Sequence, residues 1–414
     1  MRGIAMSIIR PFRAFRPAKG YEDKIPSFPY DVVNSREAKE IAKDNPFSFL
    51  HVVKPEIDLP EGTDLYSEEV YKKALENFKK LIDAKNLIEE DKPCLYIYSQ
   101  KMGDHFQSGI VGLASAKEYD EGKIKKHEHT LTKKVVDRTK HVKTTGANAG
   151  PVFLTYKKSN AVSSMVKKVQ KGEPLYDVTF TDKITHKVWK IEDETLIEKI
   201  VAEFGKLDAL YIADGHHRSE AAAQTYRDMK TPETEHFLAV FFPDKELNIL
   251  DYNRLVKDLN GLTKDQFIEK LGERFTIGEM KQAWKGRPRK RHQFGMFLDG
   301  KWHLLIAKKA FIEEKDPVKK LDSYIVQNSI LDPVLGIKDP KTDKRIDFVG
   351  GIRGTGELEK RVASGEFAVA FSMFPTSIGE LIGIADAGQV MPPKSTWFEP
   401  KLRSGFLINV FRKP

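Results

Sequence analysis

The sequence predicts a mixed α/β (α+β) fold, and three observations support this. Short apolar runs typical of buried strands alternate with segments in which apolar residues recur at helical spacing. The chain has 414 residues, more than one hydrophobic core usually organises, so we expect two or three domains. One stretch, residues 210–226, combines a strand, a tight turn and a helix.

That stretch is the clearest element of the chain. Residues 210–213 are typical of a short buried strand, and Gly215 allows the positive φ that a turn after Asp214 often needs. Residues 219–226 are rich in good helix formers. The turn therefore places the intervening residues, His216 to Arg218, at a helix N-terminus. Unpaired N–H groups and the helix dipole favour an anion there.

The side chains of this turn suit phosphate and a divalent cation. Asp214 can bind a cation beside the anion, and Arg218 offers a planar guanidinium to phosphate oxygens. We therefore predict a phosphate site made of Asp214, Gly215, His216, His217 and Arg218, with Asp214 as metal ligand. A plain surface turn is the alternative, because Asp-Gly pairs commonly mark turns.

The elements before this stretch follow from local patterns. Asn34 or Ser35 is a candidate N-cap for a helix at 36–43, and Ser67 for an amphipathic helix at 67–84. The expected domains are an N-terminal α/β region at 1–92 and a core at 93–242. In the core we expect strands at 94–100, 106–115 and 152–156, a helix at 133–142, a hairpin at 175–181 and 186–191, and a helix at 193–204.

The elements after residue 242 form a C-terminal α/β region, 243–414. We expect a strand at 237–242 leading into it, helices at 263–271 and 317–331, and strands at 293–298, 302–307 and 367–373. Residues 391–405 form a long irregular loop, and loops of that length are often functional. Its cations and hydroxyls suit a small polyanion, and the predicted donor-binding residues are Lys394, Ser395, Thr396, Lys401 and Arg403.

Composition narrows the class of protein. The hydrophobic fraction is 40% and the charged fraction 31%, as in soluble globular chains. No apolar run approaches a membrane helix, and the first ten residues are too short and too quickly charged for a signal peptide, so we expect a cytoplasmic protein. The net charge of +9 is spread among 60 acidic residues, so we expect no specific nucleic-acid partner. The single cysteine, Cys94, excludes internal disulfides and is expected to be a buried thiol.

A second polar segment, Lys126-His-Glu-His-Thr130, complements the phosphate turn. It supplies the predicted catalytic residues, which are a carboxylate, Glu128, and the flanking imidazoles of His127 and His129. Deprotonating an alcohol needs a base near the nucleophile, and Glu128 suits that role. A solvated charge on a lysine-rich loop is the alternative.

The order of these elements resembles the ParB/sulfiredoxin-like superfamily, and within it the free serine kinases. The resemblance implies a ParB/sulfiredoxin-like core with an insertion at 157–207. It also implies that Glu128 is the general base, with His127 before it, and that Asp214 to Arg218 bind phosphate and Mg²⁺. Two features depart from the compact kinases: Lys126 stands where they have proline, and the two motifs lie farther apart in the chain.

The whole chain resembles a longer prokaryotic branch labelled as a domain of unknown function. Its marks are Pro29-Tyr-Asp31, His127-Glu-His-Thr130, Thr145-Gly-Ala-Asn148, the turn at 214–218 and Met391-Pro-Pro-Lys-Ser-Thr396. The resemblance implies phosphorylation of free L-serine with Mg²⁺, and Thr145 and Asn148 as substrate-binding residues. The expected phosphoryl donor is pyrophosphate, with a slight preference over ADP or ATP, because the sequence contains no P-loop and no recognisable adenine-binding pattern. The oligomeric state stays open.

Three other activities are alternatives to serine phosphorylation. A ParB-like, nucleotide-dependent DNA-binding protein would need a helix-turn-helix module after residue 242, where strands and helices alternate instead. Sulfiredoxin-type chemistry would need a cysteine where His216 stands. A metallohydrolase built on His127, His129, His216 and His217 stays open, because imidazoles suit Zn²⁺.

Overall fold

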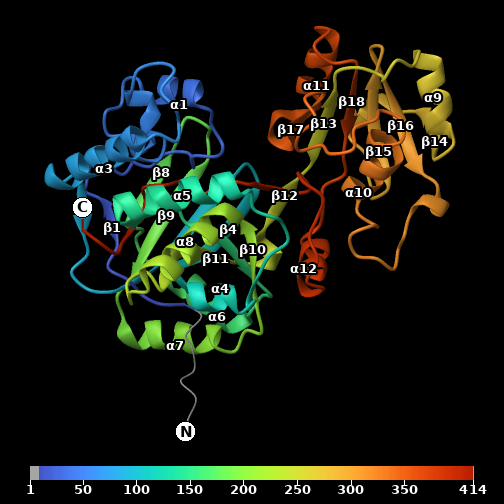
Figure 1. Cartoon of the computed structure of the whole chain (residues 1–414). Coiled ribbons are helices and arrows are strands. Elements are labelled where there is room, and N and C mark those ends of the chain that lie inside the picture. Colours follow the sequence, from blue (N-terminus) through green and yellow to red (C-terminus); the bar gives the residue numbers. More distant parts are fainter. Residues whose placement is uncertain (1–8, 414) are drawn as a thin grey trace. The chain divides into compact units, whose positions relative to one another are not determined.

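The computed structural model describes residues 9–413. The segment 1–8, which belongs to the stretch where we expect no signal peptide, lies outside the described residues. The chain forms two compact units, Met1–Leu247 with Pro400–Pro414, and Asn248–Glu399 (Figure 1). Both units contain helices and sheets, so the predicted mixed α/β class is confirmed.

The first unit is built on an eight-stranded mixed sheet. The pairs of β10 with β5 and of β11 with β7 are parallel, and the other pairs are antiparallel. The order is β5 (Ile124–Lys125), β10 (Leu210–Asp214), β7 (Val152–Tyr156), β11 (His236–Pro243), β4 (His105–Ser115), β3 (Leu95–Met102), β9 (Thr185–Ile191) and β8 (Tyr176–Thr179). Two small sheets pair β1 (Phe15–Pro17) with β2 (Leu87–Glu89), and β6 (Ala147–Asn148) with β20 (Asn409–Val410).

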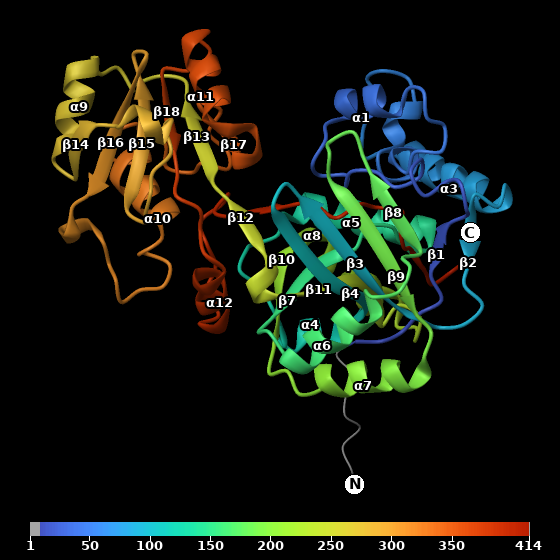
Figure 2. The same ribbon diagram turned by 180° about the vertical axis from the view of Figure 1, so that it is seen from behind.

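Helices flank this sheet. They are α1 (Ser35–Ala42), α2 (Leu50–Val53), α3 (Glu68–Asp83), α4 (Ala116–Asp120), α5 (Thr132–Thr145), α6 (Asn160–Val169), α7 (Glu194–Phe204) and α8 (His216–Met229), with short η1 (Pro55–Asp58) and η2 (Asp244–Glu246). Helices α5 and α8 pack together. They lie in front of the sheet in Figure 1, and the reverse view of Figure 2 shows the sheet in front of them.

The predicted insertion contributes α6, β8, β9 and α7. Strand β9 pairs with β3, so residues 157–207 extend the sheet at one edge. The predicted hairpin and the helix after Asp193 are confirmed, and the Asp193 side chain accepts the N–H of Leu196 as an N-cap. Helix α6 was not predicted, because only Val162 and Val166 of its polar sequence are buried.

Two predicted boundaries need correction. Ser67 precedes α3, but its hydroxyl makes no capping hydrogen bond and is buried without a partner among the described residues. The helix predicted at 317–331 begins only at Asp322, because the Asp316 carboxylate accepts the N–H groups of Val318 and Lys319 and holds a turn. The buried environment expected for Cys94 is confirmed, and burial raises the pKa of its thiol.

The second unit contains a six-stranded antiparallel sheet. Its order is β14 (Phe275–Glu279), β16 (Lys301–Ala307), β15 (Gln293–Leu298), β18 (Val369–Ser372), β13 (Tyr252–Val256) and β17 (Ile346–Gly350), and β12 (Asn248–Leu250) pairs separately with β19 (Trp397–Glu399). The helical segments are α9 (Lys264–Gly272), η3 (Gln282–Trp284), η4 (Lys309–Phe311), α10 (Asp322–Val326), η5 (Gln327–Leu331), η6 (Gly351–Arg353), α11 (Gly354–Ala363) and α12 (Ile378–Asp386). No helix in residues 9–413 is long and apolar enough to cross a membrane.

The end of α5 gives a test of the packing around the first unit. Gly146 has φ 67°, and a Cβ there would lie 2.2 Å from the carbonyl oxygen of Arg412. Gly122 has φ 76° with nothing within 4 Å of such a Cβ. Gly122→Ala should lower the free energy of unfolding by about 1–2 kcal/mol through backbone strain, and Gly146→Ala by about 1–3 kcal/mol more through the clash. Urea midpoints check this; equal midpoints would contradict it.

Candidate functional site

The site begins where β10 ends and α8 starts. Gly215 is the N-cap of α8 with φ 96°, and a Cβ at this position would lie 3.0 Å from the Arg218 Nε. Glycine is therefore required both by the left-handed backbone and by the close approach of Arg218. The helix starts at His216, so its N-terminal turn lies directly after β10, the strand next to the short edge strand β5.

A shared carboxylate fixes two cations at this point. The Arg218 Nη2 donates to Asp214 Oδ2 at 2.6 Å, and the Lys401 Nζ lies 3.2 Å from Asp214 Oδ1. Arg218 also donates through Nη1 to the carbonyl of Pro151. Burial alone would raise the pKa of Asp214, but Lys401 and Arg218 hold it far below its usual value. Asp214 is therefore ionised at neutral pH.

Two histidines of the turn bind the backbone of the segment 126–131, which we call the Glu128 loop. The N–H of His127 donates to the His216 Nε2 at 3.4 Å, and the N–H of Leu131 donates to the His217 Nε2 at 3.0 Å. An imidazole nitrogen that accepts such a bond carries no proton. Both rings therefore attach the Glu128 loop to the first turn of α8.

Burial keeps this part of the site neutral. The rings of His127 and His216 meet edge to face with centroids 4.4 Å apart. Burial lowers the pKa of His127 to about 4, and burial together with His127 lowers the pKa of His216 well below its usual value. Both imidazoles are thus uncharged at neutral pH, so His216 acts as a hydrogen-bond acceptor and not as a cation for phosphate.

Glu128 lies at the helix N-terminus on this loop. Its Oε2 is 3.9 Å from the His216 Nδ1, and 43% of its side chain is exposed. His129, one residue further, is exposed. Lys126 points to other partners, with Nζ 3.5 Å from Glu220 Oε2 and 4.0 Å from the Tyr119 ring centroid. The structure therefore brings Glu128 to the same helix end as Asp214 and Arg218.

The other predicted site residues of the first unit make hydrogen bonds or ion pairs with residues outside the turn at 214–218. Thr145 is buried, and its hydroxyl donates to the carbonyl of His141 at the end of α5. The Asn148 side chain accepts from Asn409 between β6 and β20. Arg403 pairs with Asp182 and stacks 3.7 Å from the Phe28 ring centroid. Of the two predicted cations in this part of the late loop, Lys401 reaches Asp214, whereas Arg403 is held by Asp182.

Lys394, Ser395 and Thr396 belong to the second unit. The Ser395 hydroxyl donates to Pro392 at 2.6 Å and lies 2.8 Å from the Ser323 hydroxyl. The carbonyl of Lys394 accepts from Arg254 at 3.2 Å. These contacts fix the conformation of the segment within its own unit, and its role in binding a phosphoryl donor stays a prediction.

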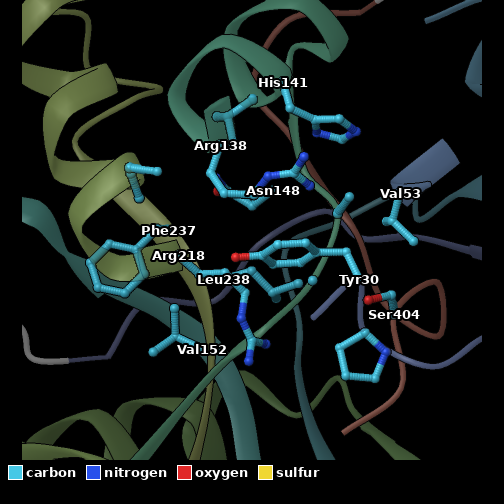
Figure 3. A pocket seen from close by; sticks show the side chains of 16 residues that line it. Tyr30, Val53, Arg138, His141, Asn148, Val152, Arg218, Phe237, Leu238 and Ser404 are labelled. Atoms are coloured by element: carbon cyan, nitrogen blue, oxygen red, sulfur yellow. The ribbon is translucent and has the colours of Figure 1, made fainter. Parts of the chain in front are cut away.

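The structure adds a cavity that the sequence analysis missed. Tyr30, Arg138, Asn148, Arg218 and Ser404 line it (Figure 3), together with aliphatic and aromatic side chains. Three of these residues, Tyr30, Asn148 and Arg218, belong to motifs named from the sequence, but nothing in the sequence showed that they share a cavity. Arg138 gave no signal, because the lysine-rich helix that carries it is typical of a solvated face.

The side chains that could hold a metal ion are few. Among residues 9–413, no group of three or more His, Cys, Asp or Glu side chains is arranged to hold one. The carboxylates at the site are Asp214, shared by two cations, and Glu128. Such a site suits a cation that arrives with phosphate oxygens of its own, as Mg²⁺ commonly does.

Comparison with curated proteins finds no match. Among solved structures, the chain is similar to a free serine kinase in complex with AMP, at 15% identity and a TM-score of 0.38, covering 72% of this chain and 91% of that one. It is also similar to a conserved hypothetical protein from Pyrococcus furiosus, at 14% identity and a TM-score of 0.35, covering 72% of this chain and 95% of that one. A third similar structure is SbnI with a C-terminal truncation from Staphylococcus aureus, at 11% identity and a TM-score of 0.39, covering 71% of this chain and 85% of that one.

A family model settles the relationship, because it matches residues 9–324, well over half of the chain. The protein belongs to the family described as "Protein of unknown function (DUF1015)".

Proposed function

We propose that this protein is a small-molecule kinase that phosphorylates free L-serine to O-phospho-L-serine with Mg²⁺. Pyrophosphate is the preferred donor, with ADP or ATP as the other choices. One observation carries the proposal: the Glu128 carboxylate lies 3.9 Å from His216 at the same helix N-terminus that holds Arg218 and Asp214. A base and a site for negative charge therefore share one helix end.

In the proposed reaction Glu128 takes the proton of the serine hydroxyl. A hydroxyl is a poor nucleophile at neutral pH, so a carboxylate within hydrogen-bond reach accelerates its attack. The hydroxyl oxygen forms a bond to the transferred phosphorus, and the bond from phosphorus to the leaving phosphate oxygen breaks. Arg218, Lys401 and the N–H groups of α8 stabilise the charge on the transferring and leaving groups.

The site residues fit a Mg²⁺ ion that is carried mainly by the donor. When bound, Mg²⁺ would neutralise charge on the donor phosphates, and Asp214 would help to hold it. Asp214 remains ionised and each of its oxygens has a second lone pair, so it can serve as a ligand. Its contacts with Arg218 and Lys401 also give it a second role, which is to orient both cations.

The site for the donor phosphates is inferred from charge. Lys401 and Arg218 lie on opposite oxygens of one carboxylate, so two cations stand side by side at the start of α8. That arrangement suits adjacent phosphate groups. A nucleotide donor would add the same phosphates with a base and sugar attached, so the test compares all three donors.

The direct test is product formation. The purified full-length chain is incubated with L-serine, Mg²⁺ and pyrophosphate, ADP or ATP in turn, and O-phosphoserine is followed by ³¹P NMR. We expect product with Mg²⁺, most rapidly with pyrophosphate, and unchanged activity after zinc-selective chelation. No product with any donor would refute the proposal, and loss of activity on zinc-selective chelation would favour the metallohydrolase alternative.

Glu128→Gln tests the base. The substitution keeps the size of the side chain and removes the basic oxygen, so kcat should fall on the order of 10²–10⁴-fold, the usual contribution of a positioned base. The KM for the donor should change little. Glu121→Gln, at an exposed carboxylate of the preceding segment, is the matched control and should retain full activity. Wild-type turnover by Glu128→Gln would remove Glu128 from the mechanism.

Arg218→Lys tests the phosphate site. Lysine keeps the positive charge but lacks the planar guanidinium that donates to Asp214 and Pro151 at once. It therefore cannot also contact phosphate in the same geometry, and kcat/KM for the donor should fall on the order of 10²-fold. Arg227→Lys is the control on the same helix, because Arg227 pairs with Asp120 and Glu220 instead. Steady-state kinetics at varied donor concentration measures the effect. Equal losses in the two variants would show that Arg218 has no specific role.

A further inference from the structure

The cavity of the first unit lies on the side of Arg218 that the proposed reaction has not used. Tyr30, Arg138, Asn148, Arg218 and Ser404 supply its polar lining (Figure 3), and Val53, Val152, Phe237 and Leu238 are among its apolar residues. The centre of a water-sized sphere can occupy about 40 Å³ of it. That is room for roughly three or four waters, or for one small end of a ligand.

Arg138 is held rigidly at this cavity. Its Nε donates to Asp137 Oδ2 at 2.7 Å, its Nη2 lies 2.7 Å from the same oxygen, and Tyr71 donates to Asp137 Oδ1 at 2.9 Å. The guanidinium carbon lies 4.1 Å from the Tyr30 ring centroid, and only 14% of the side chain is exposed. Its Nη1 has no hydrogen-bond partner among the described residues, so an oriented cation retains N–H donors for a ligand.

Arg218 brings a buried donor without a partner to the same cavity. Its Nη1 and Nη2 are used by Pro151 and Asp214. Its Nε is buried and has no hydrogen-bond partner among residues 9–413. Only 10% of the Arg218 side chain is exposed. Buried N–H groups of native proteins are nearly always bonded. Two guanidiniums with unused donors call for a ligand with acceptor oxygens and negative charge.

We propose that this cavity binds the α-carboxylate of the acceptor amino acid, with Arg138 as its anchor and Arg218 between acceptor and donor. The inference rests on the proposed kinase function and adds the part of the acceptor that is recognised. The small volume admits a carboxylate and its Cα, and the apolar lining leaves little room for pyrophosphate.

Asp31 completes the charge pattern that a free amino acid requires. It follows Tyr30 in the chain, is exposed, and raises the pKa of Arg218 through its charge. The Asp31 carboxylate, close enough to Arg218 to affect its pKa, and the guanidiniums of the cavity offer opposite charges to the two ends of a zwitterion. The acceptor class is therefore a free α-amino acid, which excludes amino alcohols and serine residues inside a polypeptide.

Binding and turnover together test the proposal on the full-length chain. Calorimetric titration with L-serine, L-serinamide, ethanolamine and inorganic phosphate compares wild type with Arg138→Gln and Arg138→Lys. Lys134→Gln, at an exposed lysine of the same helix, is the control. We expect wild type to bind L-serine about 10²-fold more tightly than L-serinamide, since a charge-assisted bidentate contact is lost in the amide. Arg138→Gln should abolish that difference and leave pyrophosphate binding unchanged.

The same variants separate this proposal from the kinase proposal. Arg138→Gln should raise the KM for L-serine on the order of 10²-fold with kcat largely retained. If Arg138→Gln does not fold, Arg138→Lys, which keeps the charge near Asp137, should still reduce the preference for L-serine over L-serinamide. Unchanged preference in a folded variant, or displacement of L-serine by inorganic phosphate alone, overturns the carboxylate site. Arg138-dependent serine binding without any phosphoserine would instead overturn the kinase and leave the carboxylate site standing.

Discussion

The arrangement of the site depends on two hydrogen bonds from backbone N–H groups to histidine rings. His216 and His217 accept the N–H groups of His127 and Leu131, and so attach the Glu128 loop to the start of α8. Acceptance requires an unprotonated nitrogen, and burial lowers the pKa of His216 accordingly. These bonds act together with the pairing of β5 with β10 just before the loop, and with the contacts of Lys126 with Glu220 and Tyr119.

A second constraint is that distant parts of the chain supply the charges. Lys401 comes from the segment that returns to the first unit after residue 399, and it shares Asp214 with Arg218. Tyr30 comes from the N-terminal part and Arg138 from α5, and both line the cavity that Arg218 borders. Arg218 thus contacts the Asp214 carboxylate and also lines the cavity, so one side chain borders both proposed substrate sites.

Local pattern predicted much of this, and its failures have physical reasons. Gly215 before good helix formers located the turn, and the alternation of residues 175–191 located the inserted hairpin. Sequence could not distinguish Lys401 from Arg403, because only the fold shows that one reaches Asp214 and the other Asp182. It also could not identify Arg138, since a partly buried ion pair on a lysine-rich helix leaves no periodic signal.

The most direct test of this account is the exchange of the Leu131 amide hydrogen, measured by NMR in the wild type and in His217→Ala. Leu131 is an exposed residue just before α5, and its N–H has the His217 ring as acceptor. We expect this amide to be strongly protected in the wild type and to exchange at least about 10²-fold faster in the variant. An unprotected Leu131 amide in the wild type, or equal protection in both, would contradict attachment of the loop by the histidine rings.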